Sequence, residues 1–167
     1  MDEPRQAPSG PDITIRSGTG SARTRLAAFD AALLAAGVGN LNLVTLSSVI
    51  PPRSLVRREA PLLVAGHGDR LYCVLATAYA DVPGQVGWAG LGWTYGEETG
   101  GLFVEHSGDT EQEVLEQIRL SLTDMGEQRG GHYGPVESVT AKACCSDRPV
   151  CAVVVAAYEV AGWASRG

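Results

Sequence analysis

The order of strand-like and helix-like segments is the feature of this sequence that most constrains its fold. Apolar and alternating stretches predict about seven strands, and a helical spacing of apolar residues occurs in only two places. Strands and helices therefore do not alternate as they do in a doubly wound α/β protein. We predict instead an α+β fold in which sheets lie face to face and the helices lie outside them.

Both helical segments have recognisable ends. The first, residues 22–36, stops at Gly37, and the second begins at a capping box, residues 110–113, and ends before Gly130. The apolar positions that define their buried faces are Leu26, Phe29 and Leu33 in the first helix and Val114, Leu115, Ile118, Leu122 and Met125 in the second.

The other segments predict strands within one domain. Residues 17–20 predict a turn, and the polar residues 53–61 predict an irregular link. We expect a single domain at residues 12–160, with tails at residues 1–11 and 161–167. Strands are predicted at residues 12–16, 62–65, 70–79, 85–95, 101–106, 135–143 and 149–158.

One further predicted strand runs directly into a pair of serines. Residues 39–46 have the apolar pattern of a buried strand, and Ser47 and Ser48 follow it. Pro51 and Pro52 then prevent the strand from continuing a hydrogen-bonded ladder. The simpler interpretation of this stretch is a turn at the end of a strand. The alternative is that one hydroxyl attacks its own backbone.

Composition and charge argue against several classes of partner. The net charge is −6, and Arg53, Arg57 and Arg58 form the only basic cluster, so nucleic-acid binding has little support. No apolar run is long enough to cross a bilayer, and the N-terminus does not resemble a secretory signal. We therefore expect a cytoplasmic protein that binds neither nucleic acid nor membrane.

The cysteines do not indicate a metal centre. Their spacing matches no zinc pattern, and two of them are adjacent, which makes a poor metal-binding pair. We predict no metal site and reduced cysteines that serve as small apolar side chains. The four cysteines are Cys73, Cys144, Cys145 and Cys151.

Three polar residues interrupt apolar segments and are candidates for chemistry. Asp30 borders the apolar face of the first helix, where a carboxylate needs either an arginine partner or a cationic ligand. Asn42 lies in the strand before the serines and is a suitable donor to a developing oxyanion. Glu105 ends an apolar strand, and in a closed pocket desolvation would raise its pKa and make it a proton donor.

Taken together, these segments resemble the pyruvoyl-dependent arginine decarboxylase family. The resemblance is carried by LAAFDAALLAAGVGNLNL at residues 26–43 and SSVIP at residues 47–51. It is supported downstream by TAY at residues 77–79, DVPG at 81–84 and GLFVE at 101–105. The sequence departs from the family pattern directly after Glu105 and in the link between residues 53 and 81. These departures bear on the choice of substrate more than on self-processing.

The resemblance implies a proenzyme that cleaves itself between Ser47 and Ser48. The hydroxyl of Ser48 attacks the preceding carbonyl, and elimination and hydrolysis leave a covalent pyruvoyl group at residue 48. Residues 1–47 become the β chain and residues 48–167 the α chain. The pyruvoyl ketone then forms a Schiff base with the α-amine of L-arginine, and carbon dioxide and agmatine are released.

The resemblance also implies roles for individual residues. Asn42 matches a residue that assists processing, Glu105 matches the proton donor, and Asp30 matches an acid that binds the cationic end of the substrate. We therefore expect Glu105→Gln to cleave normally and to decarboxylate poorly. Further positions that match the lining of the family's substrate pocket are Leu26, Gly39, Leu41, Ser47 and Val49.

The family fold is a four-layer α/β/β/α sandwich, shared with histidine decarboxylases, that assembles as homotrimers or hexamers with sites between subunits. The resemblance thus implies an arginine decarboxylase of polyamine biosynthesis. Two alternatives remain open. One is a pyruvoyl-dependent decarboxylase of another amino acid such as histidine, and the other is an unprocessed homologue that acts as an oligomeric binding protein.

Overall fold

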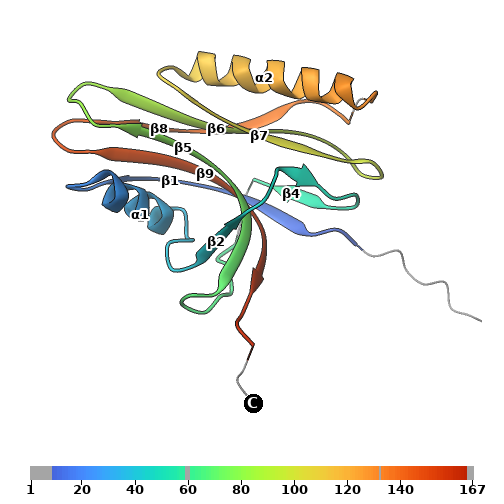
Figure 1. Cartoon of the computed structure of the whole chain (residues 1–167), viewed down its shortest axis with the longest axis horizontal. Helices are drawn as coiled ribbons and strands as arrows, with labels where there is room; N and C mark the ends of the chain where they lie inside the picture. Colours follow the sequence, from blue (N-terminus) through green and yellow to red (C-terminus); the bar gives the residue numbers. More distant parts are fainter. Residues whose placement is uncertain (1–8, 59–60, 132, 165–167) are drawn as a thin grey trace, which may run out of the picture.

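The computed structural model describes residues 9–58, 61–131 and 133–164, in which two helices and two sheets form an α+β fold (Figure 1). The strands are β1 (Asp12–Ser21), β2 (Asn42–Thr45), β3 (Val49–Ile50), β4 (Leu55–Arg57), β5 (Arg70–Ala80), β6 (Val86–Gly96), β7 (Gly100–Gly108), β8 (Glu137–Cys144) and β9 (Val150–Ala161). The helices are α1 (Arg25–Ala35) and α2 (Glu111–Gln128).

The two sheets differ in the number and in the direction of their strands. The five-stranded sheet has the order β2-β5-β9-β1-β4, with β9 antiparallel to both β1 and β5. The four-stranded sheet has the order β3-β7-β6-β8 and is antiparallel throughout. The chain passes from the first sheet to the second between β2 and β3, which is where the two serines lie.

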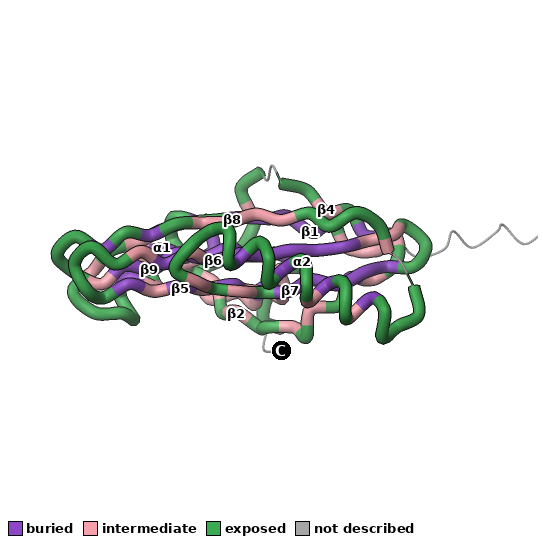
Figure 2. The backbone as a smooth tube through the Cα atoms, turned by 90° about the horizontal axis from the view of Figure 1, so that it is seen from above, coloured by how far each residue is buried: buried purple, intermediate pink, exposed green. Residues whose placement is uncertain are grey.

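The main core lies between the inner faces of the two sheets. Side chains such as Ile13, Val74, Leu91 and Phe103 are almost completely buried there. Figure 2 shows the consequence for the backbone, because the long stretches of buried residues run along the strands and the exposed residues collect in the turns and on α2. Burial of the apolar side chains in this inter-sheet layer stabilises the domain.

Helix α1 packs closely on the five-stranded sheet because β1 presents glycines to it. A Cβ on Gly18 would lie 2.3 Å from the carbonyl oxygen of Ala32, and a Cβ on Gly20 would lie 2.5 Å from the Ala32 amide nitrogen. Residues 17–20 are therefore part of β1, and the turn predicted there is wrong. The glycines allow contact between a strand and a helix, not a reversal of the chain.

Helix α2 covers the four-stranded sheet from the other side of the molecule (Figure 1). Thr110 caps its first turn, accepting a hydrogen bond from the Glu113 amide at 3.2 Å, as the capping box predicts. Val114, Ile118 and Leu122 are buried against β7 and β6. Neither helix in the described part of the chain has the length and apolar character needed to cross a bilayer.

Several expectations about individual segments were wrong. Residues 62–65 form no strand, because β2 and β4 already occupy both edges of the five-stranded sheet. The link thought to be irregular contains β4, which pairs in parallel with β1. Leu26 is 77% exposed instead of buried. β2 is largely exposed too, because it is an edge strand of its sheet.

The predicted tails lie mainly outside the described residues, which begin at residue 9 and end at residue 164. β9 continues to Ala161, one residue beyond the predicted end of the domain. The cysteines are free thiols; Cys73, Cys145 and Cys151 are buried, whereas Cys144 is exposed.

Candidate functional site

Ser48 has an unusual backbone conformation at the point where the chain passes between the sheets. Its φ is 69°, in the left-handed region that L-residues other than glycine rarely adopt. β2 ends at Thr45, and the Leu46 amide still donates to the Cys73 carbonyl at 2.9 Å. The left-handed conformation costs on the order of 1 kcal/mol for a serine, and surrounding contacts must maintain it.

Those contacts come from β7. The Ser48 hydroxyl donates to Oε1 of Glu105 at 2.6 Å, a short bond of the kind formed to a charged acceptor. The Ser48 carbonyl accepts a hydrogen bond from the Phe103 amide at 2.8 Å. The register of β3 on β7 explains both bonds, because Val49 lies opposite Leu102 and so brings Ser48 beside residues 103–105. A carboxylate in this position can take the proton of the serine hydroxyl as that hydroxyl becomes a nucleophile.

The segment that follows the serines is tied firmly to the rest of the domain. The hydroxyl of buried Ser54 donates to the Pro51 carbonyl at 2.6 Å, and the Tyr95 hydroxyl donates to the Ser54 carbonyl. The Arg53 amide donates to the Glu97 carbonyl at 2.7 Å. The chain after Ser48 is therefore held in place independently of the chain before it.

The five-stranded sheet contacts the same segment through Tyr158, a residue that the sequence did not single out. Its hydroxyl donates to the Val49 carbonyl at 2.8 Å, and its ring meets Phe103 edge-on with centroids 6.1 Å apart. Burial, and to a lesser degree the charge of Glu105, raise the pKa of the Tyr158 hydroxyl well above its ordinary value near 10, so it remains a donor at neutral pH. The sequence signal was weak, because a tyrosine near the end of an apolar strand is common.

A cavity of about 490 Å³ opens beside the serines. Leu46 and Pro51, which flank the serine pair in the sequence, both contribute to its wall. The remaining lining residues are Ser9, Gly10, Pro11, Tyr72, Tyr158 and Glu159. Glu105 itself is exposed, so the closed pocket considered for it does not form within one chain.

The other predicted site residues lie in a separate region. Asn42 donates through its side-chain amide to the Gly68 carbonyl at 2.8 Å. Gly39 and Leu41 line a different cavity of about 270 Å³, which contains none of the residues around Ser48. Asp30 and Leu26 are exposed on α1.

The nine predicted residues therefore fall into two groups. The first group lies together in space within one chain, and consists of Ser47, Ser48, Val49 and Glu105. Within the described residues the second group forms no hydrogen bond or ion pair with the first and shares no cavity with it. It consists of Leu26, Asp30, Gly39, Leu41 and Asn42.

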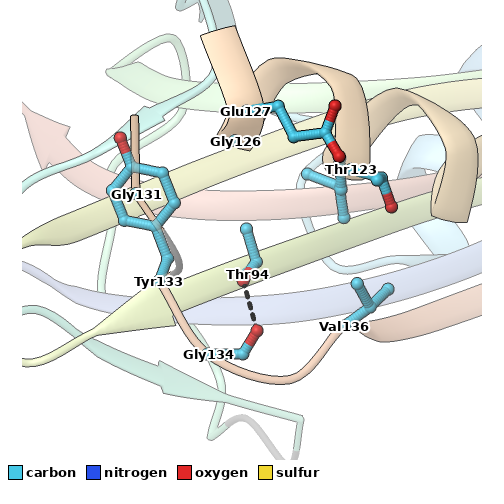
Figure 3. A pocket seen from close by; sticks show the side chains of 9 residues that line it. Thr94, Thr123, Gly126, Glu127, Gly131, Tyr133, Gly134 and Val136 are labelled. Carbon is cyan, nitrogen blue, oxygen red and sulfur yellow. Dashed lines mark hydrogen bonds between the residues drawn. The ribbon is translucent and has the colours of Figure 1, made fainter. Parts of the chain in front are cut away.

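A third pocket, of about 180 Å³, lies between the C-terminal half of α2 and β6 (Figure 3). The Thr94 hydroxyl crosses part of it to reach the Gly134 carbonyl at 2.8 Å. None of the predicted site residues line this pocket. Across the described ranges, no three His, Cys, Asp or Glu side chains are grouped so that they could hold a metal ion.

Comparison with known proteins agrees with the resemblance seen in the sequence. The family model for pyruvoyl-dependent arginine decarboxylase matches residues 12–160. Over 147 residues the chain is 35% identical to the pyruvoyl-dependent arginine decarboxylase of Thermococcus kodakarensis, covering 84% of this chain and 90% of that protein. The protein of the same name from Halobacterium salinarum is 37% identical over 155 residues, covering 89% and 94%.

The same name is carried by a relative from Pyrococcus furiosus, which is 38% identical over 133 residues and covers 78% of this chain and 83% of that protein. The residues that the family model matches extend across both sheets and both helices. The chain belongs to the pyruvoyl-dependent arginine decarboxylase family.

Proposed function

We propose that this protein is an arginine decarboxylase that makes its own pyruvoyl group from Ser48 and converts L-arginine to agmatine and carbon dioxide. One observation carries the proposal: in the uncleaved chain, the Ser48 hydroxyl already donates to the Glu105 carboxylate at 2.6 Å. Family membership supports the substrate and the cofactor, since the relatives are named for both.

Self-cleavage begins with attack of Ser48 Oγ on the carbonyl carbon of Ser47. The peptide C–N bond breaks, an ester forms, Glu105 accepts the hydroxyl proton, and the amine of residue 48 is protonated. Residue 48 then loses its Cα proton, and its bond to the ester oxygen breaks. Ser47 is released as a carboxylate, and residue 48 becomes dehydroalanine. Addition of water and release of ammonia then give the pyruvoyl group.

The residues around Ser48 fit such a group. The carbonyl of residue 48 is held by the Phe103 amide, and its side chain projects toward Glu105. When present, the pyruvoyl group supplies an electron sink for the carbon that loses carbon dioxide. Glu105, left beside residue 48 once the hydroxyl has gone, is then free to hold the proton that the product must receive.

The two chains produced by cleavage remain joined by the sheets. The β chain, residues 1–47, contributes β1, which pairs with β9 over eight positions from Thr14↔Ala157 to Ser21↔Val150. It also contributes β2, which pairs with β5. Both partners, β9 and β5, belong to the α chain, so breaking one peptide bond leaves the ladders intact.

The second group of predicted residues completes the proposal. We infer that this group acts on the substrate or on processing in a homotrimer or hexamer, where a site between subunits would join the two groups. Its members are Asp30, Asn42, Leu41, Gly39 and Leu26. Their separation from Ser48 in one chain and the exposure of Leu26 support this arrangement. A four-layer α/β/β/α sandwich in a cytoplasmic enzyme is the architecture we propose, supported by helix packing on both sheets.

Denaturing electrophoresis of the purified protein tests the proposal. We expect two fragments, the larger one blocked to Edman sequencing, and a single intact chain for Ser48→Ala. A wild-type chain that stays intact on prolonged incubation would refute the proposal. Carbon dioxide release from a panel of amino acids that includes histidine then identifies the substrate.

A further inference from the structure

We propose that Tyr158 is a positioning residue for the self-cleavage site, and that it acts from the opposite sheet by holding the carbonyl of Val49, the residue that follows Ser48. The inference rests on the proposed function, because it concerns the residue that becomes the pyruvoyl group. Tyr158 contacts the backbone that carries this residue and does not contact the reacting atoms.

An irregularity in β9 places Tyr158 where it can act. The pairing of β5 with β9 runs from Cys73↔Ala157 directly to Tyr72↔Glu159, so Tyr158 is an extra residue in a β-bulge. Successive side chains of a regular strand point to opposite faces. Here Tyr158 and Glu159 instead line the same cavity, beside Leu46 and Pro51. The bulge thus turns Tyr158 toward the point where the chain crosses between sheets.

The hydrogen bond made by Tyr158 satisfies a group that the sheet leaves open. β3 is only two residues long and pairs with β7 alone, as an edge strand of the four-stranded sheet. The Phe103 amide of β7 holds the Ser48 carbonyl, and the next carbonyl along the chain, that of Val49, is taken by Tyr158 from β9. Consecutive carbonyls on the C-terminal side of Ser48 are therefore fixed by the two different sheets.

These two bonds oppose the relaxation of a strained residue. Ser48 has a φ of 69°, and freedom in the following peptides would let it return to a more favourable conformation and turn its hydroxyl away from Glu105. The ring of Tyr158 is itself braced edge-on against Phe103, which is fully buried. Tyr158 thereby raises the fraction of molecules in which Ser48 is aligned for attack, and the rate of cleavage is proportional to that fraction.

The test compares Tyr158→Phe with Tyr95→Phe. Each substitution removes one phenolic hydroxyl that donates to a backbone carbonyl after the cleavage site, Val49 for the first and Ser54 for the second. Precursor is made in a short pulse of cell-free synthesis, and its conversion to two fragments is followed by denaturing electrophoresis. We expect about threefold to tenfold slower cleavage for Tyr158→Phe and a wild-type rate for Tyr95→Phe.

A second readout uses the fully cleaved enzyme. Because the hydroxyl holds the backbone next to the cofactor-bearing residue and not the substrate, we expect Tyr158→Phe to lower kcat with arginine by a similar factor and to leave KM unchanged. Equal cleavage rates in wild type and Tyr158→Phe would overturn the inference, and so would equal slowing by both tyrosine variants. An uncleaved wild-type chain would instead refute the proposed function itself.

Tyr158→Leu is a second variant that tests the inference if Tyr158→Phe does not fold. It removes the hydroxyl together with the ring. If the hydroxyl is what aligns Ser48, the leucine variant cleaves at least threefold more slowly than wild type while its sheets melt cooperatively. Cleavage of a folded Tyr158→Leu variant at the wild-type rate would overturn the inference by itself.

Discussion

Replacing Glu105 with glutamine is the sharpest test of how the serine is activated. The amide oxygen of glutamine can still accept the hydrogen bond that Glu105 now takes from Ser48 at 2.6 Å, but an amide cannot take up the proton. General-base assistance contributes about 10²- to 10⁴-fold to a rate. Glu105 is exposed in the single chain, so water can partly replace it, and we expect the lower end of the range.

The predicted result is self-cleavage slowed by about 10²-fold in Glu105→Gln, equivalent to about 2.7 kcal/mol in the barrier. This replaces the expectation drawn from the sequence, which was normal cleavage with poor decarboxylation. The hydrogen bond between Ser48 and Glu105 is the reason for the change, because it puts the carboxylate beside the nucleophile before the chain is cut.

The assay is a time course of precursor conversion on denaturing gels, with Glu98→Gln as the matched control. Glu98 is an exposed glutamate near the turn between β6 and β7, 3.9 Å from the Arg53 guanidinium, and its variant should cleave like wild type. Conversion of Glu105→Gln within a factor of three of wild type would show that this carboxylate is not the base.

Three further results are expected. After cleavage the two chains should elute together in native gel filtration, because β1 and β2 of one are hydrogen-bonded to β9 and β5 of the other; separation without denaturant would contradict the fold. Gly20→Ala should lower the free energy of unfolding by about 1–3 kcal/mol in urea titrations, since its Cβ would meet the backbone of α1, whereas Gly131→Ala, with open space around it, should be neutral. In the native protein at pH 8, exposed Cys144 should react rapidly with a thiol reagent, whereas burial raises the pKa of Cys73 and of Cys151 to about 11 and should protect both until unfolding; fast reaction of all the thiols would refute their burial.

The sequence predicted the elements that follow periodicity and missed those that depend on tertiary contact. The capping box at Thr110 fixed the start of α2 to within a residue. The pair Gly18 and Gly20 suggested a turn, because a glycine needed for close packing looks the same in sequence as a glycine needed for a reversal. β4 was missed because a three-residue strand carries too little pattern to stand out from a polar link.

The candidate site was predicted through resemblance more than through local pattern. Ser48 and Glu105 are 57 residues apart, and only the pairing of β3 with β7 brings them together. Tyr158 was missed because its position depends on a bulge, and the continuous run of apolar residues in β9 gives no sign of one. Long-range register and bulges are set by packing between sheets, which a single strand does not encode.

The position of the serine pair is compatible with the proposed self-cleavage, because a cut there would leave the fold intact. The last hydrogen bond from the upstream chain to the five-stranded sheet near this point is made by the Leu46 amide, and the first to β7 on the downstream side is accepted by the Ser48 carbonyl. The Ser47–Ser48 bond lies between them, outside both ladders. Cleavage there leaves both of these hydrogen bonds, and the pairing of β1 and β2 with the α chain, in place. A cut placed within β1 or β9 would instead divide a central strand of the five-stranded sheet, so the crossing between sheets is a position where strain and reactivity can be concentrated at little cost to the stability of the fold.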